Sequence, residues 1–352
     1  EADFQVVSLD LEGVTLTNMR FGAATTPDAA ISTVEASWRW DGMIPKLDAV
    51  RLTEPVLRLR LTPRGQVSAG ALDNLGGGPR GRQRPSIPTI DLEIVDGRII
   101  IDAPFGELQG PVHASGRIGE DFNAVARIAE TSRAAPNYTL DRGQAELVIA
   151  AHDNNTVALR LSGAIAGLHW ADARAENGRL LVLARTPLSL ERLDLQVAWS
   201  IGTLASARLD ATGLEGAAGA EALMRDNALE LAAWEGQAHA NAATLAFDDI
   251  RMQRPRFAAN ADGAGAVGRA RWTLGGDHFD GLGLVSQQPA ASGHLTLAEN
   301  GALSGDALIS MARAALSGGA QDDVRRAFPQ LNGSPVGPTF AQARAALDRA
   351  AD

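Results

Sequence analysis

The sequence has no cysteine among its 352 residues. A disulfide framework, a thiolate zinc site and a cysteine nucleophile are therefore excluded. The absence fits a reducing compartment and also an exported protein that does not use disulfides. Lysine is nearly absent too, because Lys46 is the only one among 32 basic residues. Lys46 lies in the stretch MIPKLD, so the sequence has no phosphate-binding P-loop, whose motif needs a lysine after its glycines.

Long apolar runs and a positive net charge are also missing. No apolar run reaches the roughly 18 to 20 residues that cross a bilayer as a helix. The net charge is −10, so we expect no nucleic-acid partner. The one basic stretch, GPRGRQRP (78–85), is short and rich in glycine and proline, which predicts a solvated loop. The chain begins at Glu1 rather than methionine, and we expect that a signal peptide or anchor preceded it.

Catalytic and metal-binding motifs are absent as well. The sequence has no G-x-S-x-G and no H-E-x-x-H, and its six histidines are scattered. GAGAVG (263–268) has the glycine spacing of a dinucleotide loop, but an alternating stretch follows it where that loop needs a helix, which favours a turn. His278 lies between Asp277 and Asp280, and a solvated loop is a simpler interpretation than a metal site. We predict no enzymatic activity, no catalytic residue, no metal and no cofactor.

What the sequence does contain is alternation. Apolar side chains recur at every second position in short segments such as 145–151, 157–161 and 193–199, with glycine, asparagine, aspartate or proline between most segments. In 57–61, three leucines alternate with Arg58 and Arg60. Successive side chains of a strand point to opposite faces, so the pattern predicts antiparallel strands with one apolar and one wet face.

The alternation also repeats at long range. Segments that begin at Val50, Leu92, Ala173 and Ile250 share one pattern: alternating apolar positions, a central dipeptide that ends in proline or glycine, and alternating apolar positions again. The starts are 42, 81 and 77 residues apart, which indicates a unit of about 40 residues with two faded copies.

The central dipeptides predict hairpins. Asp96-Gly97 and Asn177-Gly178 are typical two-residue type I′ turns. Such turns would pair Ile94 with Ile99, Leu92 with Ile101, Ala175 with Leu180, Ala173 with Val182, and Glu176 with Arg179 on the other face. Pro55 and Pro255 cannot adopt a positive φ, so those two copies need another bend; the same register would also set Arg51 against Arg58.

The C-terminal part has a different pattern. Leu308, Met311, Ala312, Ala315 and Leu316 have helical spacing before Gly318 and Gly319, and 339–352 shows a second apolar stripe. A Pro/Gly connector (331–338) lies between them. We therefore expect two regions: a repetitive β region, 1–305, and a helical segment, 306–352. The stretch 219–234 stays ambiguous between helix and strand.

Four segments resemble a known family. They are LDLEGVTLTNMRFG (9–22), LDAVRLTEPVLRLRLTPRGQVSAGAL (47–72), IPTIDLEIVDGRIIIDAPFGELQGPVHASGRI (87–118) and LNGSPVGPTFAQARAAL (331–347). They are similar to the AsmA-like proteins of Gram-negative envelopes, in particular the YdbH branch. The resemblance covers most of the chain, and it is a match of pattern rather than of a catalytic signature.

The resemblance implies an elongated antiparallel sheet that curls into a taco-like hydrophobic groove. It implies a periplasmic protein, anchored in the inner membrane by an N-terminal helix that this sequence lacks. It further implies phospholipid transfer between the inner and outer membranes, with an outer-membrane lipoprotein as the candidate partner at the far end. Family members are much longer than this chain, which would then be an N-terminal portion. The family has no catalytic residues to carry over.

The residues expected to line the groove occupy equivalent positions in the repeated units. They are Val50, Leu52, Leu57, Leu59, Leu61, Leu92, Ile94, Ile99, Ile101, Leu180, Val182, Ile250, Met252 and Phe257. Alternatives stay open at this point. Antiparallel sheets usually bury an apolar face against another sheet or a helix, which would give a closed sandwich-like binding domain. An envelope scaffold or outer-membrane protein assembly factor of the TamB-like type, and a β-rich hydrolase, are further alternatives.

Overall fold

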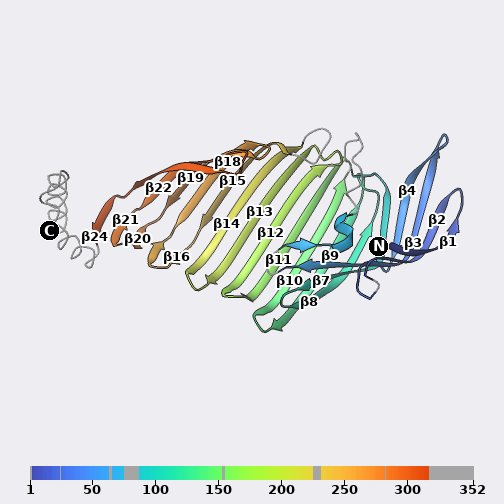
Figure 1. The fold of residues 1–352 in the computed structure, drawn as a ribbon, viewed down its shortest axis with the longest axis horizontal. Coiled ribbons are helices and arrows are strands. Elements are labelled where there is room, and N and C mark those ends of the chain that lie inside the picture. Colours follow the sequence, from blue (N-terminus) through green and yellow to red (C-terminus); the bar gives the residue numbers. More distant parts are fainter. Residues whose placement is uncertain are drawn as a thin grey trace.

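The computed structural model describes residues 2–23, 25–62, 66–74, 87–152, 155–224, 231–281 and 283–316. Within these ranges the chain forms one sheet of 24 strands and one short 3-10 helix, η1 (Gly70–Asn74) (Figure 1). The expected mainly β, largely antiparallel fold is therefore confirmed.

The strands of the N-terminal half are β1 (Ala2–Leu9), β2 (Gly13–Gly22), β3 (Pro27–Asp41), β4 (Ile44–Thr53), β5 (Val56–Leu61), β6 (Val67–Ser68), β7 (Asp91–Ala103), β8 (Gly106–Ser115), β9 (Asn123–Ala135), β10 (Tyr138–His152) and β11 (Thr156–Trp170). Those of the C-terminal half are β12 (Ala173–Pro187), β13 (Arg192–Ala205), β14 (Leu209–Met224), β15 (Leu231–Asn241), β16 (Thr244–Phe247), β17 (Ile250–Gln253), β18 (Arg256–Ala264), β19 (Val267–Gly275), β20 (His278–Gly281), β21 (Leu284–Gln287), β22 (Ala290–Leu297), β23 (Leu303–Ser310) and β24 (Arg313–Leu316).

Strands follow one another across the sheet nearly in chain order, from β1 at one end of the long axis to β23 and β24 at the other (Figure 1). Neighbours are antiparallel, except that β7 runs parallel to both β4 and β5. A parallel pair needs a crossover connection. Part of that connection is η1, which packs on β2 and β3. The buried Asp28 carboxylate holds it there, accepting hydrogen bonds from the Ala71 N–H (2.9 Å) and from Arg60 (2.6 Å).

A line of left-handed backbone residues crosses the sheet, and we call this line the crease. Eight residues with positive φ form it: Asn18, Glu54, Asp96, Arg142, Asn177, Gly213, Arg254 and Gln288. The steps between them are 36, 42, 46, 35, 36, 41 and 34 residues. The ladders β2–β3, β11–β12 and β13–β14 continue with the same partners before and after the positive-φ residue that each contains. At Asn18, Asp96, Arg142, Asn177 and Gly213 the crease is therefore a bend within a strand. At Glu54, Arg254 and Gln288 it falls between two consecutive strands.

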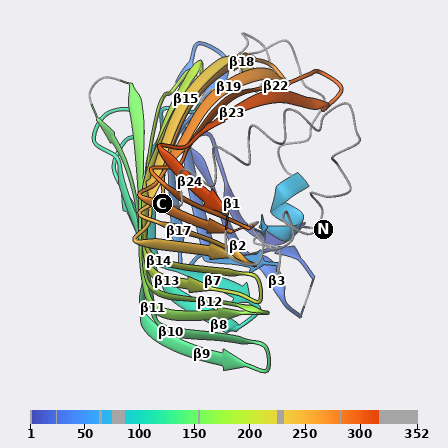
Figure 2. The same ribbon diagram turned by 90° about the vertical axis from the view of Figure 1, so that its left-hand side faces the viewer.

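The crease divides the sheet into two arms. The long arm contains β15, β18, β19, β22 and β23, and the short arm contains their continuations β16, β17, β20, β21 and β24. Viewed along its length, the sheet is C-shaped in cross-section (Figure 2). Apart from neighbouring strands, the only substantial contacts between described elements join η1 to β2 and β3.

The predicted hairpins at Asp96-Gly97 and Asn177-Gly178 are wrong. Both dipeptides lie inside continuous strands, β7 and β12. Only Asp96 (φ 53°) and Asn177 (φ 54°) have positive φ, whereas a type I′ turn needs positive φ at both positions. The pairs expected from those turns therefore do not form; Ile99, for example, pairs with Leu57 and Gly110. The strands turn back on themselves at other residues.

The repeated unit is nevertheless real. Its four central dipeptides all lie on the crease, including Glu54-Pro55 (φ 51° at Glu54) and Arg254-Pro255 (φ 47° at Arg254). The two faded copies are the crease segments around Arg142 and Gly213. The unit therefore describes a bent strand together with the strand that returns from it. The unfavourable pairing of Arg51 with Arg58 that the same register would produce does not form, because Arg51 pairs with Glu93 and Arg58 with Ile100.

The expected helix that starts at Asp306 is wrong over its described residues. Strands β23 (Leu303–Ser310) and β24 (Arg313–Leu316) continue the sheet there, and the expected boundary after residue 305 falls inside β23. A free strand edge offers backbone partners to a segment that has weak helix signals, so the sheet overrides local preference. The expected second helix, the 331–338 connector and the 78–85 loop lie outside the described residues.

Two further stretches are now assigned. GAGAVG forms the hairpin between β18 and β19, with Gly265 at φ 57°, so the turn interpretation is confirmed and the following segment is a strand. In the ambiguous stretch 219–234, the described residues belong to β14 and β15.

Candidate functional site

Register places apolar side chains in rows that cross many strands. Residues that pair across a sheet share a face. One such row runs from Ile94 through Ala114, Ala124, Ile149 and Leu159. The next row on the same face contains Leu147, Leu161, Val182, Val197, Ala218, Ala238, Ala259, Trp272, Gly293 and Ala307. We call this the apolar face.

The apolar face continues across the crease. In an extended strand, residues three apart point to opposite faces. At the crease this rule is broken, because a Cβ on Gly143 would lie 2.7 Å from Leu140 Cδ2, and one on Gly97 would lie 2.6 Å from Ile94 Cγ2. Because a left-handed residue lies between the two members of each pair, both members point to the same face of the sheet although they are three residues apart. Both arms therefore present apolar side chains to one side of the sheet.

All fourteen residues expected to line a groove lie on the apolar face. Val50 and Leu52 pair with Leu92 and Ile94, and Leu57 and Leu59 pair with Ile99 and Ile101. Leu61 follows by alternation. In the C-terminal half, Leu180, Val182 and Phe257 belong to the long arm, and Ile250 and Met252 to the short arm. They are not one cluster but parts of a surface that runs along the sheet.

Burial is concentrated on the same face. The buried apolar residues of the strands that lie on it are Ala29, Val34, Ala114, Ile128, Leu140, Ala151, Ala211 and Met252. The only cluster of buried residues in the described part, Ala114, Phe122 and Ala151, has Leu92, Ile94 and Ile149 packed against it. In a single bent sheet, side chains on the inside of the bend converge and shield one another. This asymmetry indicates that the apolar face is the inner one.

The opposite face carries the charges. Cross-strand ion pairs join Arg51 to Glu93 (3.5 Å), Arg192 to Glu221 (2.8 Å) and Arg269 to Asp262 (3.0 Å). Arg58, which alternates with the leucines of β5, pairs with Asp102 (2.7 Å) and Glu107 (3.2 Å). The hydrogen bond to Asp102 raises the pKa of Arg58 above its ordinary value. Within 57–61, the leucines therefore lie on the apolar face and the arginines on the polar face.

The apolar face is not covered in the described part of the chain. No second sheet packs on it, and the described part shows no substantial contact between strands that are not neighbours in the sheet. Large apolar side chains on it remain exposed, for example Leu180 (42%) and Phe257 (39%). A closed core would bury such residues almost completely. Exposed apolar area of this extent usually marks a binding surface.

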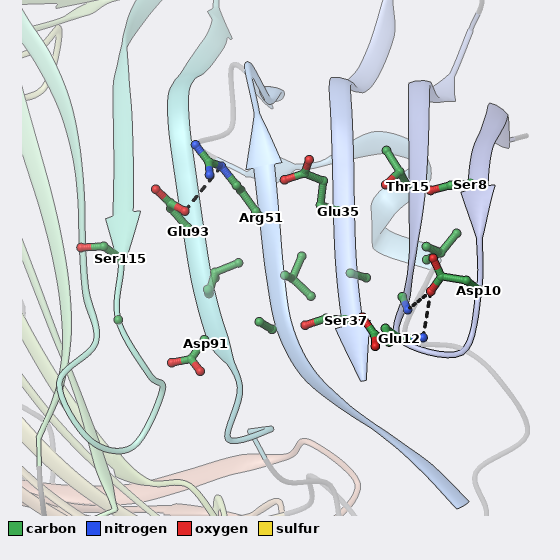
Figure 3. A pocket seen from close by; sticks show the side chains of 17 residues that line it. Ser8, Asp10, Glu12, Thr15, Glu35, Ser37, Arg51, Asp91, Glu93 and Ser115 are labelled. Carbon is green, nitrogen blue, oxygen red and sulfur yellow. Dashed lines mark hydrogen bonds and ion pairs between the residues drawn. The ribbon is translucent and has the colours of Figure 1, made fainter. Parts of the chain in front are cut away.

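A polar hollow lies on the other face, near the N-terminal end. Its volume is about 580 Å³, and its polar lining includes Asp10, Glu35, Arg51, Asp91 and Glu93, from β3, β4, β7 and the β1–β2 turn (Figure 3). Asp10 accepts hydrogen bonds from the N–H groups of Glu12 and Gly13, which closes that turn. The lining contains no histidine and no nucleophile hydrogen-bonded to a base. The hollow is therefore a weaker candidate site than the apolar face.

The described residues hold neither a cluster of metal ligands nor a helix that could span a bilayer. No group of three or more His, Asp or Glu side chains there could hold a metal ion. His278 begins β20, where its neighbours Asp277 and Asp280 serve other contacts: Asp277 pairs with Arg256 (3.0 Å), and Asp280 pairs across the strands with Arg251. None of the described helices is long and apolar enough to cross a bilayer.

Sequence reasoning missed one feature of the apolar face. In β14, β15, β18 and β19 it consists largely of alanine and glycine, and three indoles, those of Trp199, Trp234 and Trp272, lie over glycines of neighbouring strands. A Cβ on Gly263 or Gly268 would meet the Trp234 ring at 2.6 and 2.5 Å, and one on Gly293 would meet Trp272 at 2.9 Å. The small residues in 216–222 and 236–240 could have indicated this feature. Hydrophobicity scales give alanine and glycine low values, so their alternation is a weak signal.

Comparisons with known proteins do not identify a relative. No family model matches the chain, no curated protein matches it, and no solved structure matches it.

Proposed function

We propose that this protein binds lipid, holding acyl chains along the apolar face of its bent sheet. The observation that carries the proposal is one uncovered apolar face that continues across successive strands and across the crease. Hydrocarbon gains free energy wherever it removes such a surface from water, at about 25 cal/mol per Å². The polar face, with its ion pairs, keeps the outside of the protein wet.

The dimensions suit this role. A strand rises about 3.3 Å per residue, so the 16 residues of β14 follow a path of roughly 50 Å around the bend. One leaflet of hydrocarbon is about 15 Å thick. About 17 strand positions are separated by about 16 spacings of about 4.8 Å, which gives a sheet roughly 75 Å long. Acyl chains can therefore lie inside the bend while headgroups stay in water, and several lipids fit along the length.

We further propose that the chain belongs to the AsmA-like proteins, in the YdbH branch, as its sequence patterns suggest. In that setting it is a periplasmic portion of a protein anchored in the inner membrane. The lipid is phospholipid moving between inner and outer membrane, and an outer-membrane lipoprotein is the candidate partner at the far end. The elongated, single-layered sheet supports this placement, because a continuous surface suits transport along its length.

Two alternatives make different demands on the apolar face. A scaffold of the TamB-like type would use the sheet edges and the polar face, and it needs no lipid. A closed sandwich would bury the apolar face, which disagrees with the exposure of Leu180 and Phe257. Lipid binding is the function that uses the face as it stands.

A matched pair of variants tests the proposal. Leu180 and Leu183 lie on β12 with similar exposure, 42% and 37%, but on opposite faces. In Leu180→Asp a charge enters the apolar face and we expect bound lipid to be lost, because a carboxylate next to hydrocarbon loses hydration. Leu183→Asp should retain lipid. Native mass spectrometry with lipid extraction measures both.

Three outcomes decide between the readings. Loss in Leu180→Asp alone, with an unchanged melting temperature, supports a lipid surface. A parent protein that carries no lipid, and takes none up from phospholipid micelles, contradicts it and favours the scaffold. A large fall in melting temperature in Leu180→Asp alone would indicate a closed core.

A further inference from the structure

One hairpin of the sheet extends beyond its neighbours. The pairing of β2 with β3 stops at Ser37, and the pairing of β4 with β7 begins only at Ala49. Residues 38–47 between these points pair only with each other, as a two-stranded ribbon that we call the tip. It rises at the N-terminal end of the sheet in Figure 1. Five residues of each strand give a protrusion of about 15 Å.

The tip is apolar where a soluble protrusion is normally polar. Met43 at its turn is 94% exposed and Ile44 67%. The neighbouring turn between β1 and β2 adds Leu11, which is 75% exposed. Isolated exposed apolar residues are common. The far edge strand β23 also exposes Leu303, Leu308 and Ile309, but the two largest exposed fractions among the large apolar side chains of the described part, those of Met43 and Leu11, lie together at this end. Other strongly exposed apolar side chains of this group are Leu9, Trp40 and Leu47.

The two turns are tied into one platform. The indole N–H groups of Trp38 and Trp40 both donate to the carbonyl oxygen of Leu11, at 2.8 and 2.6 Å. The Trp38 N–H also donates to the Glu12 carbonyl, at 3.1 Å. The indoles therefore have their polar atoms satisfied while much of Trp40 stays exposed. The platform is held in place before anything covers it.

We propose that the tip is a membrane-contact site that inserts into the surface of a zwitterionic bilayer. Apolar side chains lie at the turn, Met43, and on one face, which carries Trp40. On the other face, Ile44 lies beside the charged Arg39, Asp41 and Lys46. A protein partner would cover one face, whereas a bilayer surrounds a protrusion. Tryptophan next to aliphatic side chains is typical of the membrane interface.

The charges of the tip fit an uncharged bilayer surface. The three charged side chains of the tip and the adjacent Asp48 cancel: Lys46 pairs with Asp41, and Arg39 with Asp48 at 3.6 Å. Asp10 and Glu12 in the neighbouring turn make the platform weakly acidic. An anionic surface would repel it, so insertion is driven by apolar burial, and binding to phosphatidylcholine is insensitive to salt.

The tip also continues the apolar face. Trp38 and Trp40 alternate with Val34 and Ala36 along β3, and Val34 pairs with Leu52 on that face. A lipid drawn from the bilayer at the tip would meet no polar barrier before reaching the sheet. This continuity gives the contact a role in the proposed transfer, although insertion of the tip does not itself depend on lipid bound elsewhere.

Flotation with phosphatidylcholine vesicles tests the contact on the full chain. We expect the parent to float and Ile44→Asp to float roughly tenfold less or worse, because burying one isoleucine side chain is worth at least that factor. Leu308→Asp is the matched control, since Leu308 is 70% exposed on the polar face of the far edge strand. It should float like the parent.

A second readout uses the absence of cysteine. A single Met43→Cys, labelled with a polarity-sensitive dye, should shift to the blue with vesicles, whereas the label on Leu308→Cys should not. A parent that does not float, a Met43→Cys label that does not respond, or equal losses in Ile44→Asp and Leu308→Asp would each overturn the proposal. So would binding that requires anionic lipid. Leu180→Asp separates this test from the lipid-binding proposal: it should lose bound lipid and still float.

Discussion

Strands β10 to β13 and the strands β14, β15, β18 and β19 build the same face of the same sheet from different side chains. In the first region, the aliphatic part, the rows read Leu147, Leu161, Val182 and Val197. In the second, the small-residue part, they read Ala218, Ala238 and Ala259, with indoles laid over glycines. The strands pair antiparallel throughout both regions, with one register shift between β14 and β15.

This difference shows that the backbone pairing of the sheet does not depend on which side chains line its apolar face. Backbone hydrogen bonds and alternation hold both regions, so the lining can change without changing the fold. Branched aliphatic side chains fill the inside of the bend in the aliphatic part. Alanine leaves the surface lower in the small-residue part, while each indole occupies the space above a glycine. We expect more room for lipid there.

The largest effect should come from the packing of the aliphatic part. Leu140 is 5% exposed and packs at the crease over Gly143. We expect Leu140→Ala to reduce the free energy of unfolding by about 3 kcal/mol, because it removes buried methyl groups and leaves a cavity. Leu183→Ala, on the polar face, should change it by less than about 1 kcal/mol. Urea denaturation measures both, and equal effects would show that the bend does not depend on this packing.

An intermediate effect should come from the indole–glycine contacts of the small-residue part. Alanine usually stabilises a strand relative to glycine, but a Cβ on Gly216 would collide with the Trp199 ring. We expect Gly216→Ala to reduce the free energy of unfolding by about 1–3 kcal/mol. Gly219, also on β14, has no atom closer than 3.8 Å to an added Cβ, so Gly219→Ala should be neutral or stabilising. If both variants have the same free energy of unfolding, the indole can move aside and its contact with glycine does not stabilise the sheet.

A smaller change in stability should accompany a change in capacity. Replacing the paired Ala218 and Ala238 by leucine makes the small-residue part resemble the aliphatic part. Because the face is uncovered, we expect stability to change by less than about 1 kcal/mol, while fewer lipids co-purify by native mass spectrometry. The control replaces Ala198 and Ala217, which pair on the polar face, by leucine. If the first variant binds as many lipids as the parent, the small-residue part does not hold more lipid than the aliphatic part.

The smallest effect concerns a surface ion pair at the end of the small-residue part. Hydrogen bonds from Arg208 lower the pKa of Asp248 below its ordinary value of 3.8. A lowered folded-state pKa stabilises the fold above the unfolded-state value and is lost as the pH falls through the lowered one. Asp248→Asn should therefore lower the melting temperature slightly at pH 7, and this difference should shrink progressively as the pH falls below 3.8. Asp249→Asn is the control, and a difference that persists in acid would assign the effect to another contact.

The sequence was informative about faces and uninformative about connections. Strict alternation assigned Leu57, Leu59 and Ile99 to one side, and the structure keeps them together. The same sequence led us to hairpins at Asp96-Gly97 and Asn177-Gly178, because a dipeptide that tolerates positive φ serves a turn and a bend equally well. Only pairing with strands on both sides distinguishes the two uses. The helix expected from Leu308 failed for a related reason, since a free strand edge outweighed helical spacing.

The strand class, the repeat of about 40 residues and the residues of the apolar face could be predicted from the amino-acid sequence alone. These properties are local or periodic, and side-chain alternation expresses them directly. Tertiary structure alone decided that the units bend rather than turn, that the apolar face crosses the crease without changing sides, and that the tip at Met43 stands clear of the sheet. Those depend on which strands lie beside each bend, and hydrogen bonds between residues far apart in the chain set them.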